Sequence, residues 1–508
     1  MRRYIGAMYD VIIIGSGLGG LFSAALIKNA FPSLSILVLE GHTVPGGCAS
    51  YYDRFIRVGD SEEKIRFRFD VGATTLSGIE EGQSVRQLLD TLKISIRSKH
   101  CEIGTHIVLS DGTRINRFAD RDKWHRESAR IFGNKTVAFW LEIEQLASKA
   151  WSVSGKYPFF PFIDLKDVLR TASTLKIEDI AITAKSQQSM WSLLAKHGLT
   201  CNTKFIAFLD EQLLISLQCK TQEAPLLLAA LALDYPSETY YIEGGMYTVA
   251  ERVAERFVEL GGEIRYKEYV KSITYSIQDT NYSLVTKKES AFQAKHIISN
   301  ATIWNTYSML DDSLRNVRDY LSKDIVRIPD TIWGGLDIYG VIGDSVDDKG
   351  ALYHQLHGDG YSVFLSLSDR DDRLKAPLGY RVFSCSTHER NPKSWFGLGK
   401  EEYDKKRQEA FERVEAPLYK YLDGYTNAKK LLIEFATPSS YEFYTRRSFG
   451  RVGGIPHTRS RKLWQWRSNA TPQKGLYMVG DTVFPGQGTP ALAQCALNLL
   501  ERFKRDLL

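Results

Sequence analysis

Three glycines near the beginning of the chain, Gly15, Gly17 and Gly20, have the G-x-G-x-x-G spacing of a phosphate-binding turn. The first permits a tight turn, the second lets a pyrophosphate approach the backbone, and the third lets the next helix pack close to its strand. Glu40 follows Gly20 by twenty residues and ends the segment "SILVLE", where a carboxylate would accept hydrogen bonds from ribose hydroxyl groups. This spacing predicts that the chain binds a dinucleotide.

Two more glycine-rich segments have the composition of ligand-binding turns. Gly46 and Gly47 follow the second predicted strand and would allow a second close approach of backbone to ligand. A bare NAD-binding domain has no evident need for this pair, so it favours FAD. Residues 475–500, "GLYMVGDTVFPGQGTPALAQCALNLL", read as a strand, a turn with three glycines and a helix. The start of that helix would offer free N–H groups to the negative charge that a reduced flavin develops near N1.

The elements that must position these turns alternate between strand and helix. Residues 9–14 and a segment beginning near Ser35 predict two strands around a helix, and the C-terminal segment predicts one more strand of the same sheet. Residues 331–390 alternate as short strands and predict a mostly antiparallel sheet. Helical periodicity dominates over residues 84–235, and a charged helix is expected over residues 400–418.

We therefore predict an α/β fold in which two domains interleave along the chain, because no low-complexity linker separates the blocks. One is a Rossmann-like FAD-binding domain made of residues 1–80, 240–325 and 440–508. The other is an α+β substrate domain, membrane-associated and built of a mostly antiparallel sheet plus helices, made of residues 81–239 and 326–439.

The composition limits the classes of function. The 508 residues are 43% hydrophobic and 25% charged, as in an ordinary globular protein. A net charge of +6, scattered along the chain, does not indicate nucleic-acid binding but would not oppose an anionic membrane surface. Six cysteines without a CxxC pair indicate reduced thiols and a cytoplasmic protein. No segment reaches the about 18 apolar residues of a spanning helix, so we expect a chain that does not cross a membrane.

Two apolar stretches could contact a membrane surface. "WSVSGKYPFFPFIDLK", residues 151–166, holds five aromatic residues with Lys156 and Lys166, a combination typical of a bilayer interface. "PLLLAALAL", residues 225–233, is the longest apolar run. Core helices and a packed loop explain both stretches equally well, so the two interpretations stay open.

The side chains of metal and nucleophilic catalysis form no convincing group. His354 and His357 make an HxxH pair without a third ligand nearby, so no metal is expected. Cys48 and Cys495 lie in the glycine-rich motifs, where a small buried hydrophobe explains each as well as a redox role does. The sequence identifies no catalytic residue and leaves the oligomeric state open.

Eight motifs, in order along the chain, resemble those of the carotenoid desaturase and isomerase flavoproteins, a family of phytoene desaturase-like and prolycopene isomerase-like proteins. The link "IRVGDSEEKIR" is longer than in most of the family, and residues 491–495 replace the glycine and small residues that usually continue the last motif. The motifs are "DVIIIGSGLGGL", "LEGHTVPGGCASYYDR", "RFDVGATTLSG", "IEGGMYTVAERVAE", "GGEIRYKEYVKSI", "IISNAT", "LSDRDDRLKAPLGY" and "GLYMVGDTVFPGQGTPA".

The resemblance implies non-covalent binding of FAD. Residues 15–20 would hold its pyrophosphate, Glu40 its adenosine ribose, and Val270 would offer backbone groups to the adenine. The turn at 486–490 would lie near the isoalloxazine. The expected cofactor-binding residues are Gly15, Ser16, Gly17, Leu18, Gly19, Gly20, Glu40, Gly41, His42, Gly46, Gly47, Val270, Gly480, Asp481 and Gly488.

The resemblance further implies an FAD-dependent carotenoid desaturase, in which a hydride passes from a long apolar polyene to flavin N5. A redox-neutral cis–trans isomerase that uses reduced FAD is one alternative. Another is a non-enzymatic escort protein for isoprenoid lipids, against which the intact glycines and Glu40 argue. The expected partners are the polyene and, peripherally, a membrane surface.

Overall fold

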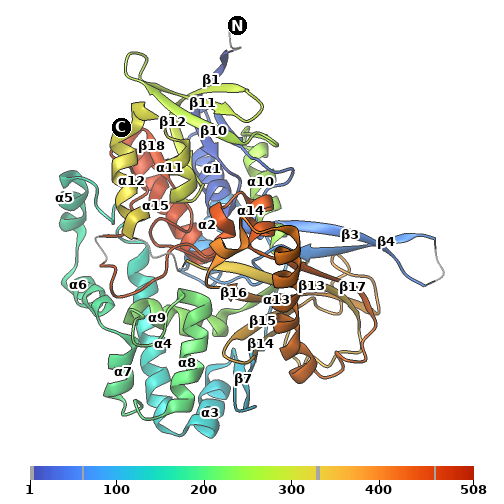
Figure 1. Cartoon of the computed structure of the whole chain (residues 1–508). Coiled ribbons are helices and arrows are strands. Elements are labelled where there is room, and N and C mark those ends of the chain that lie inside the picture. Colours follow the sequence, from blue (N-terminus) through green and yellow to red (C-terminus); the bar gives the residue numbers. More distant parts are fainter. Residues whose placement is uncertain (1–4, 60–61, 328–331, 463–464, 508) are drawn as a thin grey trace.

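The computed structural model describes residues 5–59, 62–327, 332–462 and 465–507. Two large sheets dominate it: one lies in the upper part of Figure 1 with the N-terminal strand, and the other lies below it beside a group of helices. The strands of each sheet, and the helices that pack on it, come from distant parts of the chain. The predicted α/β fold class is confirmed.

The first sheet has seven strands in the order β10-β11-β12-β1-β2-β9, with β18 beside β12. They are β1 (Ile5–Ile14), β2 (Ile36–Leu39), β9 (Glu263–Arg265), β10 (Val270–Ser276), β11 (Asn281–Thr286), β12 (Ala291–Ser299) and β18 (Leu476–Met478). β1 runs parallel to β2 and β12, and β18 runs parallel to β12 with Leu476 opposite Ile297. The C-terminal segment therefore supplies one more strand of this sheet, as predicted.

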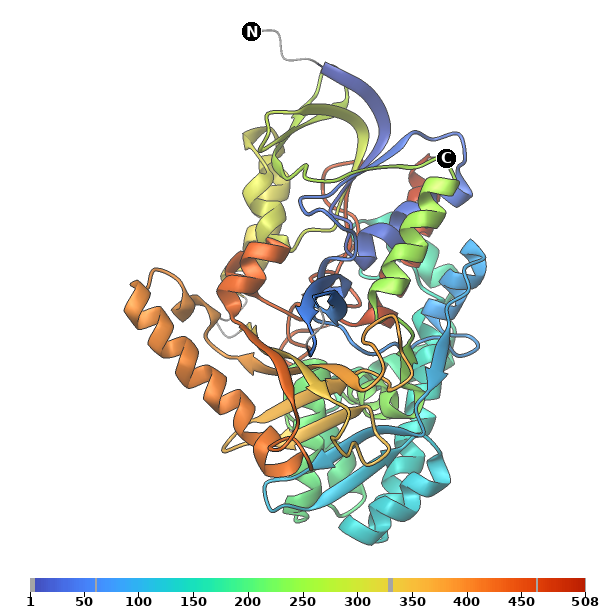
Figure 2. The same cartoon turned by 90° about the vertical axis from the view of Figure 1, so that its right-hand side faces the viewer.

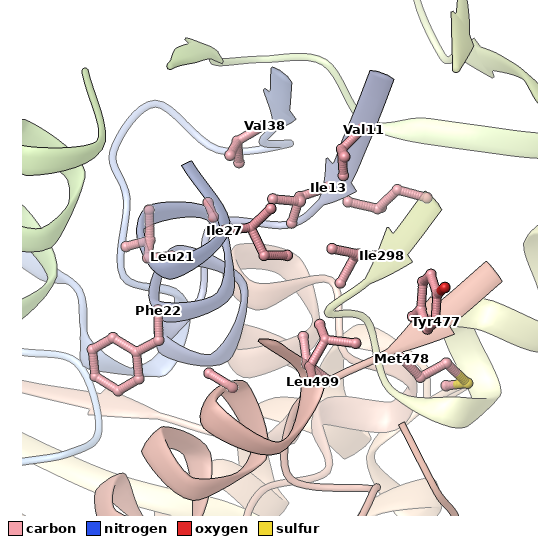
Figure 3. Close-up of a cluster of buried hydrophobic side chains, with 14 of the residues drawn as sticks. Val11, Ile13, Leu21, Phe22, Ile27, Val38, Ile298, Tyr477, Met478 and Leu499 are labelled. Carbon is pink, nitrogen blue, oxygen red and sulfur yellow. The ribbon is translucent and has the colours of Figure 1, made fainter. Parts of the chain in front are cut away.

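Several helices share the core of this sheet, among them α1 (Leu18–Ala30), α10 (Tyr247–Glu259) and α15 (Thr489–Leu507). Figure 3 shows Val11 and Ile13 of β1 in one cluster with Ile298 of β12 and Leu499 of α15. The central strands are apolar on both faces because helices cover both. Burying each such side chain stabilises the fold by about 1.5–3 kcal/mol, and the cluster fixes where the loop after β1 lies.

The second sheet has the order β17-β13-β16-β15-β14-β6-β7. β13 to β16 pair in antiparallel fashion, which confirms the prediction for residues 331–390. β6 and β7 were not expected, since residues 84–235 were predicted to be mainly helical. The strands are β6 (Ile103–Val108), β7 (Arg114–Phe118), β13 (Gly334–Gly343), β14 (Tyr353–His357), β15 (Ser362–Leu367), β16 (Tyr380–Glu389) and β17 (Lys430–Ala436).

Helix α13 (Lys400–Tyr421) covers one face of the second sheet, and Figure 2 shows it along the outside of the molecule. It is the charged helix predicted over residues 400–418. Its buried side chains, among them Val414 and Leu418, pack on Leu336 and Ile338 of β13. Because side chains alternate along a strand, the intervening residues of β13 point to the opposite face of the sheet.

A group of helices packs beside the second sheet. α9 is the apolar segment 225–233, and it is buried with α4 and α8 in one core. The interpretation of that segment as a core helix is confirmed, and its membrane interpretation is wrong. Across the described residues no helix combines the length and hydropathy needed to span a bilayer. The helices are α2 (Ser84–Leu92), α3 (Arg121–Phe132), α4 (Lys135–Ser154), α5 (Leu165–Thr174), α6 (Ile177–Ala184), α7 (Met190–Lys196), α8 (Thr203–Leu217) and α9 (Leu226–Asp234).

The remaining elements connect these layers. A hairpin of β3 and β4 projects to the right in Figure 1, and β5 pairs with β8. Their bounds are β3 (Tyr51–Arg57), β4 (Lys64–Asp70), β5 (Ser98–His100), β8 (Tyr240–Ile242), α11 (Ile303–Met309), α12 (Arg315–Arg327) and α14 (Pro438–Thr445). Short 3-10 helices are η1 (Gly47–Ala49), η2 (Lys185–Gln187), η3 (Tyr235–Glu238), η4 (Asp312–Leu314), η5 (Pro392–Trp395) and η6 (Ser448–Gly450).

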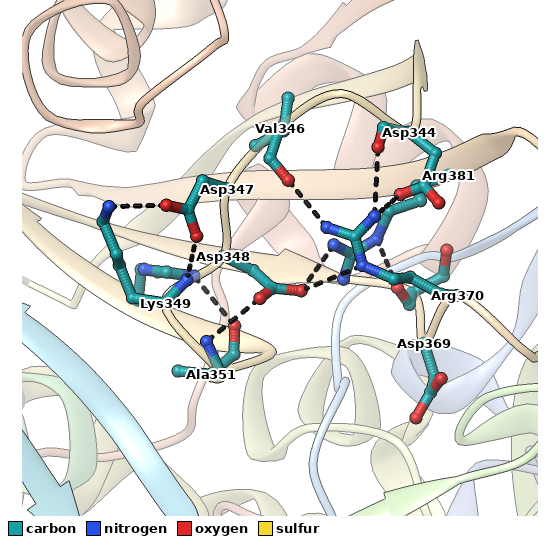
Figure 4. A network of polar contacts seen from close by, with 12 residues as sticks. Asp344, Val346, Asp347, Asp348, Lys349, Ala351, Asp369, Arg370 and Arg381 are labelled. Carbon is teal, nitrogen blue, oxygen red and sulfur yellow. Dashed lines mark hydrogen bonds and ion pairs between the residues drawn. The ribbon is translucent and has the colours of Figure 1, made fainter.

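A network of charged side chains holds the connection between β13 and β14 (Figure 4). Arg381, whose side chain is fully buried, donates from Nη1 to the Asp348 carboxylate at 2.7 Å. Arg370 approaches the same carboxylate at 3.6 Å and donates to the Val346 carbonyl at 2.8 Å. A buried guanidinium needs such a partner, because an unpaired charge in the interior is strongly destabilising.

Candidate active site

A cavity of about 1190 Å³ is lined by loops of the first sheet, by β13, β15, β16 and β17 of the second, and by helices that include α4, α8 and α9. A site for one small ligand usually occupies about 300–1,000 Å³. The cavity therefore has room for a cofactor and for part of a second molecule.

A backbone cradle forms one wall of the cavity. Gly15 has a φ of +90°, which glycine adopts without strain. The Gly46 N–H donates to the Ser16 carbonyl at 2.8 Å and ties the two glycine-rich loops together. A Cβ atom on Gly17 would stand 2.7 Å from Nδ2 of Asn300, so the glycine makes room for this side chain from the end of β12. Asn300 also lines the cavity. In the sequence it is marked only as a polar residue at the end of the apolar strand in "IISNAT".

Glu40 stands at the end of β2 and also lines the cavity. Its Oε2 accepts hydrogen bonds from the Ser16 N–H at 2.8 Å and the Ser16 hydroxyl at 2.6 Å, and Oε1 accepts from the His42 N–H at 2.6 Å. A carboxylate has about four lone-pair positions. Three are used here, which leaves one for a donor such as a ribose hydroxyl.

The C-terminal turn forms a further part of the wall. Asp481 pairs with Arg447 at 2.8 Å, and Gly480 has a φ of +115°. Gly488 has a φ of +94° and precedes α15, whose first residue Thr489 lines the cavity. The first N–H groups of a helix have no partner within the helix, so this wall can stabilise negative charge.

Thirteen of the fifteen expected cofactor-binding residues line this one cavity. The other two lie behind it. Ser16 is buried against Glu40, and a Cβ on Gly20 would stand 2.2 Å from the Gly15 carbonyl oxygen, so Gly20 permits close packing of α1 on β1. The cradle, the free acceptor position and the helix start fit an elongated dinucleotide. The thirteen are Gly15, Gly17, Leu18, Gly19, Glu40, Gly41, His42, Gly46, Gly47, Val270, Gly480, Asp481 and Gly488.

Apolar side chains line the other part of the cavity. They come from the helices beside the second sheet and from the face of that sheet opposite α13. Such a wall excludes water and accepts an extended hydrocarbon. Among these residues are Trp151, Ile215, Leu217, Leu228, Leu231 and Phe364.

Asp337 is a buried carboxyl group in this part of the cavity, whose lining also includes Asp234, Glu238 and Glu434. Asp337 of β13 is 2% exposed and lines the cavity together with Tyr339 and Tyr441. Its Oδ2 accepts from the Tyr441 hydroxyl at 2.9 Å, and the Tyr339 hydroxyl lies 3.3 Å from the same oxygen. Burial raises the pKa of Asp337 to about 7, against the effect of these hydroxyls. The sequence offered a signal, since "GLDIYGVI" places one acid in an otherwise apolar strand.

The other candidate groups are not brought together. All six cysteines are free, and burial raises the pKa of the Cys48 and Cys495 thiols. The His357 ring lies 2.8 Å from Glu211, and His354 bonds the Ala351 carbonyl at 3.0 Å. The described residues hold no group of three or more side chains suited to bind a metal ion.

Comparison with known proteins agrees with this geometry. The model of the NAD(P)-binding Rossmann-like domain matches residues 13–92. Prolycopene isomerase, chloroplastic, from Daucus carota is 26% identical over 98% of this chain and 80% of its own length. The 1-hydroxycarotenoid 3,4-desaturase of Flavobacterium sp. (strain P99-3) is 21% identical over 95% of this chain and 96% of its own length. The resemblance drawn from the motifs is confirmed, and it extends over nearly the whole chain.

Solved structures show the same architecture. An oxidoreductase from Methanosarcina mazei superimposes with a TM-score of 0.62 at 16% identity, covering 97% of this chain and all of that chain. Identity this low establishes the fold alone. The Rossmann-like domain joined to a second sheet is therefore an arrangement that this chain shares with other proteins.

Proposed function

We propose that this chain is an FAD-dependent enzyme that acts on the double-bond system of a carotenoid, with desaturation as its reaction. The observation that carries the proposal is the continuity of the cavity, which runs from the glycine cradle to the apolar wall. A dinucleotide at the cradle and a long apolar polyene at the wall would share one continuous space. The names of the related proteins support a carotenoid as that polyene.

FAD would be held without a covalent bond. The cradle would receive its pyrophosphate, Glu40 a ribose hydroxyl and Val270 the adenine, while Gly480, Asp481 and the turn before α15 would hold the flavin end. Bound FAD supplies a hydride acceptor at flavin N5. The residues of this chain position the cofactor, exclude water through the apolar wall and stabilise negative charge at the start of α15.

Cis–trans isomerisation of a carotenoid is the second candidate. The specific observation in its favour is that the identity to prolycopene isomerase, 26%, exceeds the identity to the desaturase, 21%. The same site serves both reactions, because each needs a flavin beside a conjugated chain. They differ in whether the product has one more double bond or only a changed geometry.

The test is an anaerobic incubation of purified protein with a panel of acyclic carotenoids, followed by chromatography of the products. With oxidised flavin, desaturation yields at most one new double bond per flavin and bleaches the flavin absorbance. Isomerisation instead requires reduced flavin and leaves the number of double bonds unchanged. A protein without flavin absorbance, or without product from any carotenoid in either redox state, would contradict the proposal.

We further propose that the chain docks peripherally on a membrane surface. Seven large apolar side chains are exposed within nineteen residues on and around α5 and α6, and we call them the α5–α6 patch: Phe162, Leu165, Val168, Leu169, Leu175, Ile177 and Ile180. Exposed Lys166, Arg170 and Lys176 accompany it. Apolar side chains beside basic ones suit an anionic bilayer interface.

The α5–α6 patch covers residues 162–180 and so lies farther along the chain than residues 151–166, the aromatic stretch that the sequence indicated as a membrane contact. Phe159 and Phe160 are half-buried: Phe160 packs on Phe484 at a centroid distance of 5.2 Å, and Arg502 lies 5.6 Å from the Phe159 ring. These two rings therefore anchor the loop. Ser154, at the end of α4, lines the cavity and precedes the patch by a few residues, which supports entry of a lipid-dissolved substrate from this side.

A further inference from the structure

We propose that Asp337 is the acid–base residue of this site and that its Oδ1 exchanges a proton with a carbon of the polyene. The inference deepens the proposed function and rests on it. It starts from an oxygen without a partner: Oδ1 is buried and accepts no hydrogen bond from any described residue, while Oδ2 is held by Tyr441. A buried polar atom rarely stays unsatisfied unless a ligand or a reaction uses it.

The position of Asp337 within the cavity suits the role. It lies on the face of β13 opposite α13, between Gly335 and Tyr339, and all three line the cavity. The Tyr339 hydroxyl also donates to the carbonyl of Val71, in the loop that carries Thr74 and Thr75 along the same wall. The carboxyl group is thereby fixed on a strand with both tyrosine hydroxyls at Oδ2, so among the described residues Oδ1 is the oxygen left free for a proton.

The surroundings keep the carboxyl group close to the balance between its two protonation states. Asp337 forms no ion pair among the described residues, and burial raises its pKa to about 7. Tyr441 donates a hydrogen bond that opposes this shift. Other titratable or charged groups lie on this cluster or on the adjoining walls. They include Tyr339, Tyr52, Cys48, Cys385, His388, Arg407, Tyr444, Arg446, Asp234, Glu238, Glu434 paired with Arg54, and Asp481 paired with Arg447.

Isomerisation needs Oδ1 protonated at the start, and desaturation needs it ionised. In isomerisation the Oδ1–H bond breaks and a C–H bond forms at a polyene carbon, so the π pair becomes that bond and leaves an allylic cation. Rotation follows, and loss of the same proton to Oδ1 restores the double bond without any oxidant. In desaturation, departure of a hydride to the flavin leaves a cation, and ionised Oδ1 takes the proton of the adjacent carbon, whose C–H electron pair becomes the new double bond.

The test compares wild type with Asp337→Asn, which keeps the shape and the bond from Tyr441 but cannot exchange a proton. Turnover should fall by about 10²- to 10⁴-fold, whereas flavin content and KM stay near wild type. Tyr441→Phe removes the donor that favours the ionised form, so it should move the limb of the pH–rate profile to higher pH. A limb that falls with rising pH identifies the acid of isomerisation, and one that rises identifies the base of desaturation.

A second readout does not depend on activity. The folded protein binds the Asp337 proton more tightly than the unfolded chain, whose aspartates have a pKa of about 3.9. Ionisation therefore lowers the stability of wild type as the pH rises from about 4 through about 7. Asparagine does not ionise, so Tm of Asp337→Asn should rise relative to wild type over this range, and the infrared band of a protonated carboxyl should disappear.

The outcomes of these tests distinguish a failure of this inference from a failure of the proposed function. If wild type converts no polyene, the proposed function fails and the inference fails with it. If wild type is active and Asp337→Asn turns over within a few-fold of it, only the inference is overturned. A Tm difference that does not change with pH would also overturn it, because Asp337 would then not titrate.

Discussion

At the scale of single residues, the site is organised by groups that bind the chain to itself as well as to a ligand. Asn300 occupies the space that Gly17, Gly19 and Gly480 leave free: Cβ atoms on them would stand 2.7, 2.8 and 3.3 Å from its carboxamide. The glycines thus serve a protein side chain, in addition to the pyrophosphate that the spacing predicts. Glu40 also serves both the chain and a ligand. It accepts a hydrogen bond from the Ser16 N–H and keeps one acceptor position free.

Replacing Glu40 by glutamine tests this arrangement. The amide group would place N–H donors against the N–H groups of Ser16 and His42 and would remove a charge-assisted acceptor. FAD affinity should fall by about 1.5–3 kcal/mol, which is about ten- to 150-fold in Kd. Flavin fluorescence during titration of apoprotein measures it. Glu263→Gln, on neighbouring β9 and outside the cavity, is the matched control, and an equal loss in both variants would contradict a role at the ribose.

At the scale of elements, α5 has one face that packs on the rest of the chain and an opposite face that is exposed and apolar. Its inward-facing Asp167 is fully buried and accepts from Arg502 Nη1 of α15 at 2.7 Å, with Arg505 beside it. Its outward face carries Leu165 and Leu169 of the α5–α6 patch. A helix held so firmly on one side and apolar on the other presents a fixed surface, which suits docking on a bilayer.

The substitution of Leu165, Leu169 and Ile177 by serine should weaken this docking. Removing three exposed apolar side chains lowers the area that enters the interface, so binding to anionic liposomes should fall by at least tenfold, at about 0.8 kcal/mol per buried CH₂. Sedimentation with liposomes measures it, and flavin content should not change.

A matched control exists because Ile277 is 83% exposed and Ile177 is 84% exposed. Ile277 lies in the turn that follows β10 of the first sheet, away from the patch, and Ile277→Ser should leave liposome binding unchanged. Retained binding by the triple variant would show that the protein meets membranes through another surface.

The connection between β13 and β14 makes a separate prediction about stability. Asp348→Ala would leave the fully buried Arg381 without its main partner, and the free energy of unfolding should fall by about 3–5 kcal/mol. Asp347→Ala removes a half-exposed pair with Lys349 and should cost about 0–1 kcal/mol. Chemical denaturation of the two variants gives the comparison. Equal losses would mean that the buried pair contributes no more than the exposed one.

At the scale of the whole molecule, local signals predicted the first sheet and the cradle, because strand, glycine turn and helix follow one another within thirty residues. The hairpin of β6 and β7 was not predicted, although Asp111-Gly112 is typical of a hairpin turn. Its strand β6 joins the second sheet by pairing with β14, which is distant in the sequence. The Asp337 cluster could not be predicted, because its partner Tyr441 is 104 residues away. The domain boundaries and the cofactor contacts remain predictions.

The late position of β18 also sets an order of events during synthesis. A ribosome delivers about 5–20 residues per second, so β18 emerges about 10–35 s after its neighbour β12. Until then the end of that edge of β12, Ile297 to Ser299, lacks this strand, since β11 pairs only with residues 291–294. Open strand edges pair with other chains. The nascent chain is therefore open to such pairing until translation is nearly finished, and the cavity between Gly15 and Gly488, in which we propose that FAD binds, is complete only then.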